Sequence, residues 1–350
     1  MKDDTRRRKG DRKISKKRKF IDENLESKFG IDAFTEGEKR LGWLLTFTTS
    51  SWEDTDMQNV YSCVDLYFVR QDGTTFKVKY KFRPYFYKGM YASMELVDYF
   101  VFNLLSWFYE RIQDCMDCIV DLREYDVPYH VRFAIDNDIR SGLWYDVNVS
   151  SDGVTLERRH DLLQRAEVHV CAFDIETTKL PLKFPDAEYD LVMMISYMVD
   201  GRGYLIINRE DLEYTPKPEF EGQFKVTNVK NEEELIKLWF SRMREVKPGI
   251  YVTYNGDFFD WPFLENRAAH HGLRMNDELG FQCDKIQGEC CAKFACHLDC
   301  FAWVKRDSYL PQGSHGLKAV TKAKLGYDPL EVNPEDMVRF AIEKPQVHNL

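Results

Sequence analysis

The sequence predicts an α/β domain over residues 161–350, preceded by a smaller β-rich domain over residues 29–160. An apolar run at 168–175 is too short for an ordinary helix and is typical of a strand buried on both faces. Later segments alternate between strand-like and amphipathic helical patterns, as in α/β sheets. Residues 30–87 are rich in aromatic and β-branched residues interrupted by turn residues, which favours strands. A chain of 350 residues is long enough for two such domains.

The β-rich part begins with strands and turns. Three strands are predicted, at 42–49, 61–70 and 75–81. Asp72-Gly73 supplies the positive φ that a tight hairpin turn requires between the last two. Pro84 suits a strand edge. Apolar residues nearly encircle 91–118, which predicts a buried helix. Residues 119–150 return to strand patterning around 125–130.

The α/β part follows from residue 161. Four strands are predicted, at 168–175, 191–199, 203–208 and 250–253. Residues 200–202 form a hairpin turn, and a polar insertion covers 209–230. An amphipathic helix is predicted over 232–245 with Asn231 as its N-cap. A second helix runs to His271, with Pro262 in its first turn.

Residues 1–20 carry a dense positive charge. They hold eleven Lys or Arg against three Asp, about +8, which leaves about −17 for the remainder of a chain whose total is −9. Because this segment has little to bury, we expect residues 1–28 to form a disordered basic tail. Its two basic clusters suit a nuclear-import signal or a loose nucleic-acid tether, and a solubilising tail is the alternative.

Composition indicates a globular protein of a reducing compartment. The apolar run 99–109 is well short of the roughly 20 residues that span a bilayer, and the N-terminus is too charged for a signal peptide. The nine irregularly spaced cysteines predict reduced thiols, with Cys171 and Cys300 buried and free. Zinc among the cysteines of 283–300 is a minor alternative, because structural zinc sites usually show two tight pairs.

Two acids, Asp174 and Glu176, stand where the apolar run ends. Side chains at i and i+2 share one face of a strand, so the two carboxylates lie close together. Like charges held together favour a cation between them, and Mg²⁺ or Mn²⁺ suits oxygen ligands. Two solvated acids at the start of a loop are the alternative.

A second polar cluster follows the strand 250–253. Asn255 and Asp260 lie between this strand and the next helix. A third carboxylate at a neighbouring strand end could complete a site for two divalent cations about 3.5 to 4 Å apart. Such a site could hold a scissile phosphate and activate a water for in-line attack.

The sequence around these acids resembles a known family. Phe-Asp-Ile-Glu-Thr-Thr at 173–178 is similar to the first exonuclease motif of family B DNA polymerases, and Tyr-Asn-Gly-Asp-Phe-Phe-Asp at 254–260 is similar to the second. Further stretches resemble the epsilon branch of that family, at 83–87, 121–130, 179–186, 193–198, 303–311 and 322–329. The resemblance covers most of residues 36–88 and 119–345.

This resemblance implies an RNase H-like (DnaQ-like) 3′-5′ exonuclease domain in a nuclear, replicative DNA-directed DNA polymerase. Asp174, Glu176 and Asp260 match the family's catalytic, metal-binding carboxylates, with Mg²⁺ or Mn²⁺ as the cofactor. Asn255 matches a position that helps to place the single-stranded 3′ end of DNA. Other subunits of the polymerase complex are implied as partners, and no membrane. The family's iron–sulfur cluster would lie in a polymerase region that this chain lacks.

Some residues near the motifs have alternative roles. Phe259 could stack a frayed base of DNA, although packing of the strand–helix junction is the favoured role of Phe258 and Phe259. Lys305 and Arg306 could hold a DNA phosphate or form a solvated pair. Asp299, on a predicted strand, could support the architecture of the site.

The chain departs from the family in three places. It ends at Leu350, before the third exonuclease motif, whose Tyr-x-x-x-Asp spacing occurs here only as a chance match at Tyr61 and Asp65. The polymerase module is absent. Residues 89–118 replace a longer stretch of the N-terminal domain, and Gly316 stands where the family tends to have a side chain.

The combined interpretation is a C-terminally incomplete exonuclease domain with three of its carboxylates. Removing one part of a two-metal site costs orders of magnitude in rate, so we expect this chain by itself to be exonuclease-deficient. A catalytically inactive DNA-binding or replisome-scaffolding fragment is the alternative, and an independent deoxyribonuclease is a weaker one.

Overall fold

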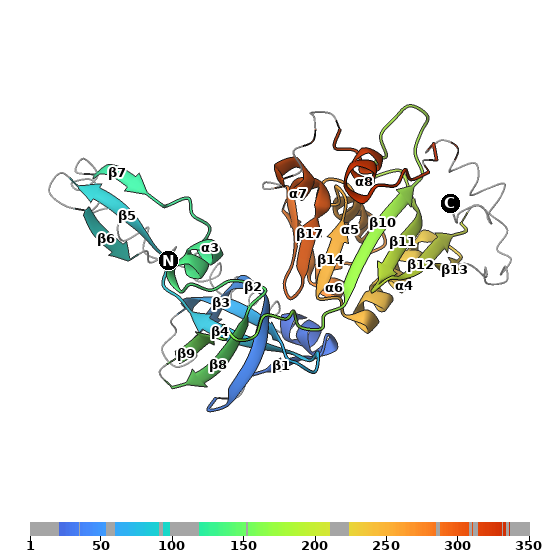
Figure 1. Ribbon diagram of the computed structural model, residues 1–350. Coiled ribbons are helices and arrows are strands. Elements are labelled where there is room, and N and C mark those ends of the chain that lie inside the picture. The colour runs from blue at the N-terminus through green and yellow to red at the C-terminus, as the bar shows by residue number, and fades with distance from the viewer. Residues whose placement is uncertain are drawn as a thin grey trace, which may run out of the picture. The chain divides into compact units, whose positions relative to one another are not determined.

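The structure is a computed structural model in which the chain divides into two compact units. It describes residues 21–34, 36–53, 60–90, 94–98, 119–151, 153–210, 224–284, 288–307, 310, 314–330, 332, 333 and 336. One unit is formed by Ile31–Glu167, and the other by the residues up to Gly30 together with those from Val168 onward. Figure 1 shows the elements of both units.

The unit Ile31–Glu167 is built on a six-stranded sheet of order β1-β4-β3-β2-β8-β9. Its strands are β1 (Ile31–Ala33), β2 (Lys39–Glu53), β3 (Val60–Val69), β4 (Thr75–Lys81), β8 (Trp144–Ser150) and β9 (Gly153–Arg158). The three predicted strands are therefore confirmed. In the turn between β3 and β4, Gly73 has a φ of 80° and the Thr74 amide donates to Asp72 Oδ1 at 2.9 Å. The core gathers on one sheet face around Leu66, Phe68 and Phe76.

Two predictions for this unit are wrong in part. The residues expected in a helix at 91–118 include β6 (Met94–Asp98), which pairs with β5 (Tyr85–Met90) beside β7 (Ile119–Arg123). A segment with apolar residues on every side can form a paired strand as well as a buried helix, and here its pairing with β5 makes it a strand. Residues 99–118 lie outside the described residues.

The strand pattern expected around 125–130 is interrupted by helix α3 (Tyr129–Asp136). Pro128 precedes this helix, and the amides of Val131 and Arg132 donate to its carbonyl. Phe133 is fully buried against the sheet, so packing overrides a weak local pattern.

The second unit contains a mixed sheet of order β13-β12-β11-β10-β14-β17. Its strands are β10 (Val170–Thr177), β11 (Val192–Val199), β12 (Arg202–Asn208), β13 (Phe224–Val229), β14 (Ile250–Thr253) and β17 (Cys296–Asp299). Strands β10, β11 and β12 are antiparallel, whereas β14 runs parallel to β10 and β17 parallel to β14. The four predicted strands are confirmed.

Strand β13 is a correction to the polar insertion expected at 209–230. It pairs parallel to β12 and is the edge strand of the sheet among the described residues, where a half-buried face tolerates a polar sequence. Residues 211–223 lie outside the described residues.

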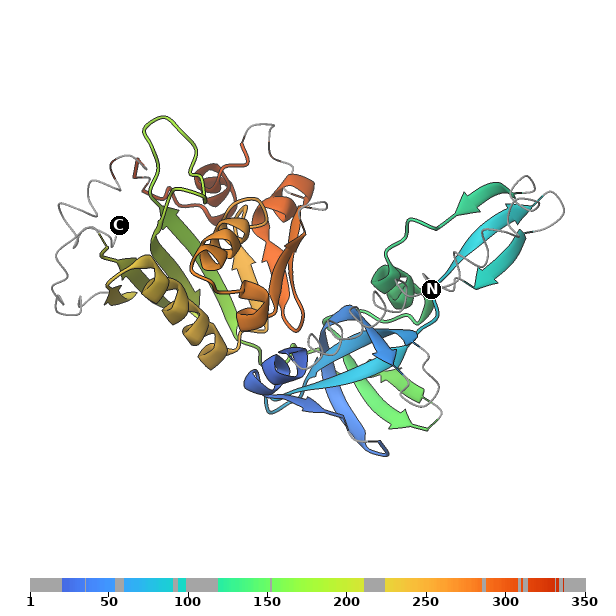
Figure 2. The same ribbon diagram turned by 180° about the vertical axis from the view of Figure 1, so that it is seen from behind.

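Helices α4 (Glu232–Val246), α5 (Asp260–His270) and α6 (Met275–Leu279) cover one face of this sheet, as Figure 2 shows from behind. Both predicted helices are confirmed, and Asn231 caps α4 by accepting the Glu234 amide at 2.9 Å. The ring of Phe173 on β10 packs between Trp239 of α4 and Trp261 of α5. This aromatic contact fixes both helices to the central strand.

Strand β10 is buried on one face only. Cys171, Phe173 and Ile175 point into the core, whereas Ala172 and Asp174 on the other face are exposed. The expectation of a strand buried on both faces is therefore wrong. Period-two alternation between the faces is not visible in the sequence, because small Ala172 is as apolar as its buried neighbours.

The N-terminal part of the second unit is a helix over residues 21–28. Residues 1–20 of the expected disordered tail lie outside the described residues, and the expectation is wrong for 21–28. Leu25 and Phe29, one helical turn apart, are 2% and 8% exposed. The ring of Phe29 lies 4.7 Å from that of Phe294, so the helix docks through buried apolar side chains.

A hairpin of β15 (Phe281–Asp284) and β16 (Glu289–Ala292) pairs Cys283 with Cys290 in a disulfide. The expectation of reduced thiols is wrong for this pair, because antiparallel register brings the two Cα atoms to 4.1 Å, which irregular spacing in sequence does not reveal. Cys171 is free and buried, and Cys300 is free and half-buried.

Within the described residues, no helix is long and apolar enough to cross a membrane.

Candidate active site

The first two acids of the site lie near the end of β10. Asp174 pairs with Ser196 and Glu176 with Met194 of β11, and a register shift follows Glu176. Alternation along the strand places both carboxylates on the face opposite to Phe173 and Ile175. Helices α7 (Cys300–Asp307) and α8 (Leu317–Leu325) lie toward this end of the sheet in Figure 1.

The turn between β14 and α5 is held in an unusual conformation. Asn255 has a φ of 68°, in the left-handed region that side chains seldom occupy. Buried Asp299 accepts the amides of Asn255 at 2.8 Å and Asp257 at 3.1 Å. At Gly256, a Cβ atom would lie 2.3 Å from Thr253 Oγ1, so only glycine fits. Backbone geometry therefore favours Asn255 and Gly256 in this turn, and Asp299 holds the turn in place.

Asp260, the first residue of α5, brings the two acidic segments together. It is 1% exposed, and its Oδ1 accepts the amide of Ile175 at 3.1 Å. Its carboxyl group also lies against that of Asp174, close enough for each acid to affect the pKa of the other. Two acids that are 86 positions apart in the sequence therefore share a contact between β10 and α5.

The electrostatics of the three acids favour a neutralising partner. Burial raises the pKa of Asp174 even though part of its side chain reaches solvent. Burial, followed by the charge of Asp174, raises the pKa of Asp260. The same two causes raise the pKa of Glu176 to about 7. Two carboxylates in contact cannot both ionise at low cost, so the Asp174–Asp260 pair favours a positive charge beside it.

The chemistry of these donors fits a hard divalent cation. Closely spaced carboxylates that resist ionising without a nearby positive charge are typical ligands of divalent cations. Within the part of the chain that the structure describes, however, no three Asp, Glu, His or Cys side chains converge closely enough to hold a metal ion together. Asp174 and Asp260 are in contact, and Glu176 lies two residues further along the same face.

The residues expected to bind DNA are spread around this pair. Asn255 is half-buried in the turn, and Phe259 packs against Phe184 and Phe263. Lys305 and Arg306 are exposed in the last turn of α7.

Phe258, in the same turn, departs from its expected role. It is 69% exposed, so the expectation that it packs the strand–helix junction is wrong. The turn directs this ring outward, because Asp257 and Phe259 on either side of it make the inward contacts.

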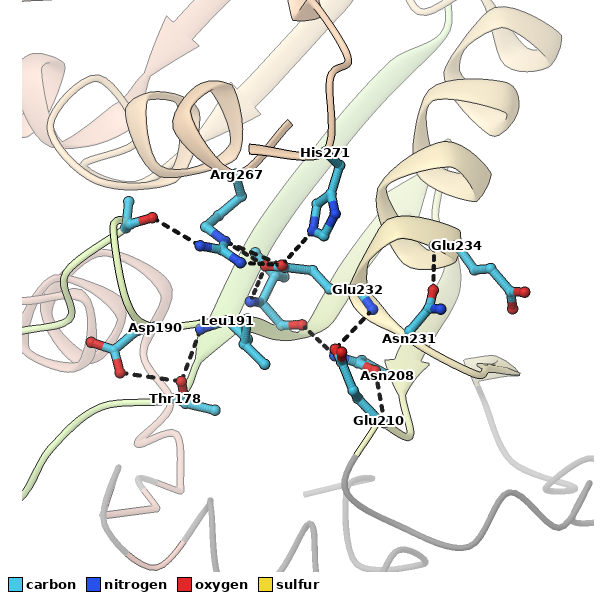
Figure 3. Close-up of polar contacts among 12 residues, drawn as sticks. Thr178, Asp190, Leu191, Asn208, Glu210, Asn231, Glu232, Glu234, Arg267 and His271 are labelled. Carbon is cyan, nitrogen blue, oxygen red and sulfur yellow. Dashed lines mark hydrogen bonds and ion pairs between the residues drawn. The ribbon is translucent and has the colours of Figure 1, made fainter. Parts of the chain in front are cut away.

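A buried ion pair behind the site could not be predicted from the sequence. Glu232 of α4 binds Arg267 of α5, and both side chains are enclosed (Figure 3). Charged residues on amphipathic helices usually face solvent, so their presence in the two predicted helices carries no signal. On the loop 178–191, Leu182 and Phe184 are exposed.

A mixed sheet with acids at the end of β10 and at the start of α5 is the arrangement of a polymerase-associated exonuclease domain. Residues 120–320 match the family described as DNA polymerase family B, exonuclease domain. The chain belongs to this family.

The individual relatives are more specific. The chain is 62% identical to a DNA polymerase epsilon catalytic subunit of Arabidopsis thaliana over 98% of its own length and 20% of the relative's. It is 53% identical to a DNA polymerase epsilon catalytic subunit of Saccharomyces cerevisiae, over 70% of this chain and 11% of the yeast protein. The chain thus spans about a fifth or less of the length of these relatives.

A solved structure supports the fold. The family B DNA polymerase of the archaeon Pyrobaculum calidifontis superposes with a TM-score of 0.63 over 86% of this chain and 42% of the archaeal protein, at 18% identity. The RNase H-like, mixed α/β architecture expected from the sequence is thereby confirmed.

Proposed function

We propose that this chain is the N-terminal and exonuclease portion of an epsilon-type replicative DNA polymerase that acts in the nucleus. In this proposal the second unit hydrolyses the 3′-terminal phosphodiester bond of DNA, as a proofreading exonuclease. The contact between Asp174 and Asp260 supports it most directly, because it joins the two acidic segments within a family B exonuclease domain.

Asp174, Glu176 and Asp260 would hold Mg²⁺ or Mn²⁺, and the bound ions would neutralise phosphate charge and lower the pKa of an attacking water. The chain's own residues position the substrate. Asn255, fixed by Asp299, would orient the 3′-terminal nucleotide, with Phe259 at its base. Exposed Lys305 and Arg306 would attract the backbone of a single-stranded 3′ end.

The partners in this proposal are the primer end of DNA and the other components of a polymerase complex. Each of the two epsilon relatives is named as a catalytic subunit, which implies that further subunits exist. Polymerisation and any iron–sulfur cluster would belong to regions of the relatives that this chain does not cover.

A catalytically inactive DNA-binding or scaffolding role is the second candidate. It is favoured by one observation: among the described residues the three acids do not converge as a single metal-holding group. In this alternative the exonuclease unit would still bind a single-stranded 3′ end, and hydrolysis would be below detection.

The deciding experiment is release of nucleotides from a 3′-labelled single-stranded oligonucleotide with Mg²⁺. The chain is compared with its Asp174→Ala, Glu176→Ala double variant, and with a longer version that continues through a third exonuclease motif. Activity that the double variant loses supports the exonuclease. Activity in the longer version alone supports the exonuclease-deficient interpretation of this chain, and activity in neither contradicts the proposal.

A further inference from the structure

The carboxylate of Glu232 is enclosed by protein and has partners on several sides. It is 0% exposed and accepts the amide of Val192 at 2.7 Å. Arg267 donates to it from Nε at 2.9 Å and from Nη2 at 2.6 Å, and His271 Nε2 lies 2.7 Å away. Figure 3 shows the side chains of Arg267 and His271 directed at this one carboxylate.

Arg267 also reaches the loop that follows the first two acids. Its remaining terminal nitrogen, Nη1, donates to the carbonyl oxygen of Ala187 at 3.1 Å. The base of this loop is closed by Thr178, whose amide donates to the Leu191 carbonyl while its Oγ1 accepts the Leu191 amide, both at 2.9 Å. One guanidinium therefore ties α5 both to α4 and to the loop 178–191.

The ion pair connects the two acidic segments of the site. Val192, which donates to Glu232, is paired with Thr177, the residue directly after Glu176. Arg267 lies seven residues after Asp260 on α5, two turns along the same helical face. Movement of the β10 end relative to α5 would therefore strain the chain of contacts from Val192 through Glu232 to Arg267.

A contribution to stability alone does not explain why the Arg267–Glu232 ion pair is buried. Removing two charges from water is costly, and an apolar pair of similar volume is often at least as stable. A fork-shaped guanidinium with a fixed hydrogen-bond pattern instead restricts the geometry of the elements it joins. The Arg267–Glu232 pair is thus suited to a positioning role.

We propose that Arg267 and Glu232 are positioning residues of the exonuclease site, which hold the end of β10 beside the start of α5 so that Asp174 stays in contact with Asp260, the two acids that a divalent cation would meet first. This inference rests on the proposed function. If it is correct, breaking the Arg267–Glu232 pair weakens binding of a divalent cation, and not only the folding of the chain.

The test uses the Glu232→Gln, Arg267→Met double variant of the full chain. The amide oxygen of glutamine can still accept the Val192 amide, and His271 can still contact the new side chain, so the variant specifically removes the guanidinium link from α5 to α4 and to Ala187. A matched control is Glu233→Gln with Lys237→Met, an exposed ion pair on the same helix. Three quantities are measured: the melting temperature, hydrogen exchange of the amides in 178–191, and the affinity for Mn²⁺ by calorimetry.

We expect the double variant to melt within a few degrees of the control, with loop amides that exchange at least tenfold faster and a Kd for Mn²⁺ raised at least tenfold. Loop exchange and Mn²⁺ affinity equal to those of the control would overturn the inference.

If the double variant fails to fold, Arg267→Lys serves instead. It keeps a positive charge beside Glu232 and loses the bond to Ala187, so faster loop exchange supports the inference and unchanged exchange overturns it. Absence of Mn²⁺ binding by the unaltered chain would contradict the proposed function. In that case, hydrogen exchange of the loop 178–191 would still show whether Arg267 and Glu232 hold this loop in place.

Discussion

At the level of single residues, the site is governed by carboxylates that ionise with difficulty. Asp260 is held between the Ile175 amide and the Asp174 carboxyl group, and burial raises the pKa of both acids. Folding therefore makes both acids harder to ionise than they are in the unfolded chain. A cation supplied at the same place would relieve the same penalty.

This penalty predicts a pH-dependent effect of Asp260→Asn. A carboxyl group whose pKa is raised on folding costs nothing below its unfolded pKa near 4, and costs more as the pH rises toward its raised folded pKa, as for Asp260. Without metal, the variant should be more stable than the unaltered chain at pH 8 by roughly 1 to 3 kcal/mol, and no more stable at pH 4.

Thermal unfolding at the two pH values, with chelator present, measures this difference. Addition of Mg²⁺ at pH 8 should stabilise the unaltered chain more than the variant. A gain from Asp260→Asn that is the same at pH 4 and pH 8 would show that ionisation is not its cause.

The turn of the second motif gives another prediction about a single residue. Gly256→Ala would place a Cβ atom 2.3 Å from Thr253 Oγ1, so the turn must shift and should cost about 2 kcal/mol or more. Because Asp260 follows this turn, any affinity for Mn²⁺ should fall as well. Gly316→Ala is the control, since nothing lies within 4 Å of its Cβ position and its φ is −63°.

Denaturant unfolding of the two glycine variants provides the measurement. Equal midpoints for Gly256→Ala and Gly316→Ala would mean that the turn adjusts freely and does not restrict the motif.

At the level of secondary-structure elements, the helix at 21–28 belongs with strands more than 140 residues away in the sequence. Leu25 and Phe29 are buried, and Asp22 forms an ion pair with Lys293. Gly280 lies beside these contacts: a Cβ there would come within 2.9 Å of the Phe294 ring. The helix is therefore an integral part of the unit that carries the acids.

Phe29→Ala should accordingly destabilise the second unit by about 3 kcal/mol, the usual cost of emptying a buried aromatic site. Leu163→Ala is the control, because Leu163 is 91% exposed. Native-state hydrogen exchange of β10 and β14 reports on the unit. Protection equal to that of the control would mean that the helix docks without contributing to stability.

Over the molecule as a whole, charge is divided unevenly along the chain. Eleven of the 49 basic residues lie within the first 20 positions, while the remainder is acidic. Phosphate contacts by such a segment release counterions and depend steeply on salt. An acidic remainder, by contrast, repels DNA except at local basic positions such as Lys305 and Arg306.

Deletion of residues 1–20 should therefore weaken binding to single-stranded DNA at low salt and reduce the slope of log affinity against log salt by several units. Fluorescence anisotropy between about 50 and 300 mM salt measures both. A version with the same 20 residues in shuffled order should bind like the original. An unchanged slope after deletion would assign DNA binding to the folded units alone.

The fold was largely predictable because local patterns and tertiary structure agree over most elements. Asn231 caps α4, Asp72-Gly73 turns the hairpin, and alternation places Asp174 and Glu176 on one face. The exceptions are segments whose pattern is compatible with two structures. The residues of α3 form a helix because the helix buries Phe133, and the residues of β6 form a strand because they pair with β5. Neither outcome follows from local sequence preferences.

Local sequence patterns were sufficient to predict the set of acids, the strands and helices that carry them, and the family they resemble. Long-range packing was needed to show that Asp174 meets Asp260, that Glu232 and Arg267 pair out of solvent, and that the helix at 21–28 joins a unit distant in the sequence. Periodicity acts over neighbours a few residues apart, whereas these contacts depend on how sheets and helices pack across long separations in the chain.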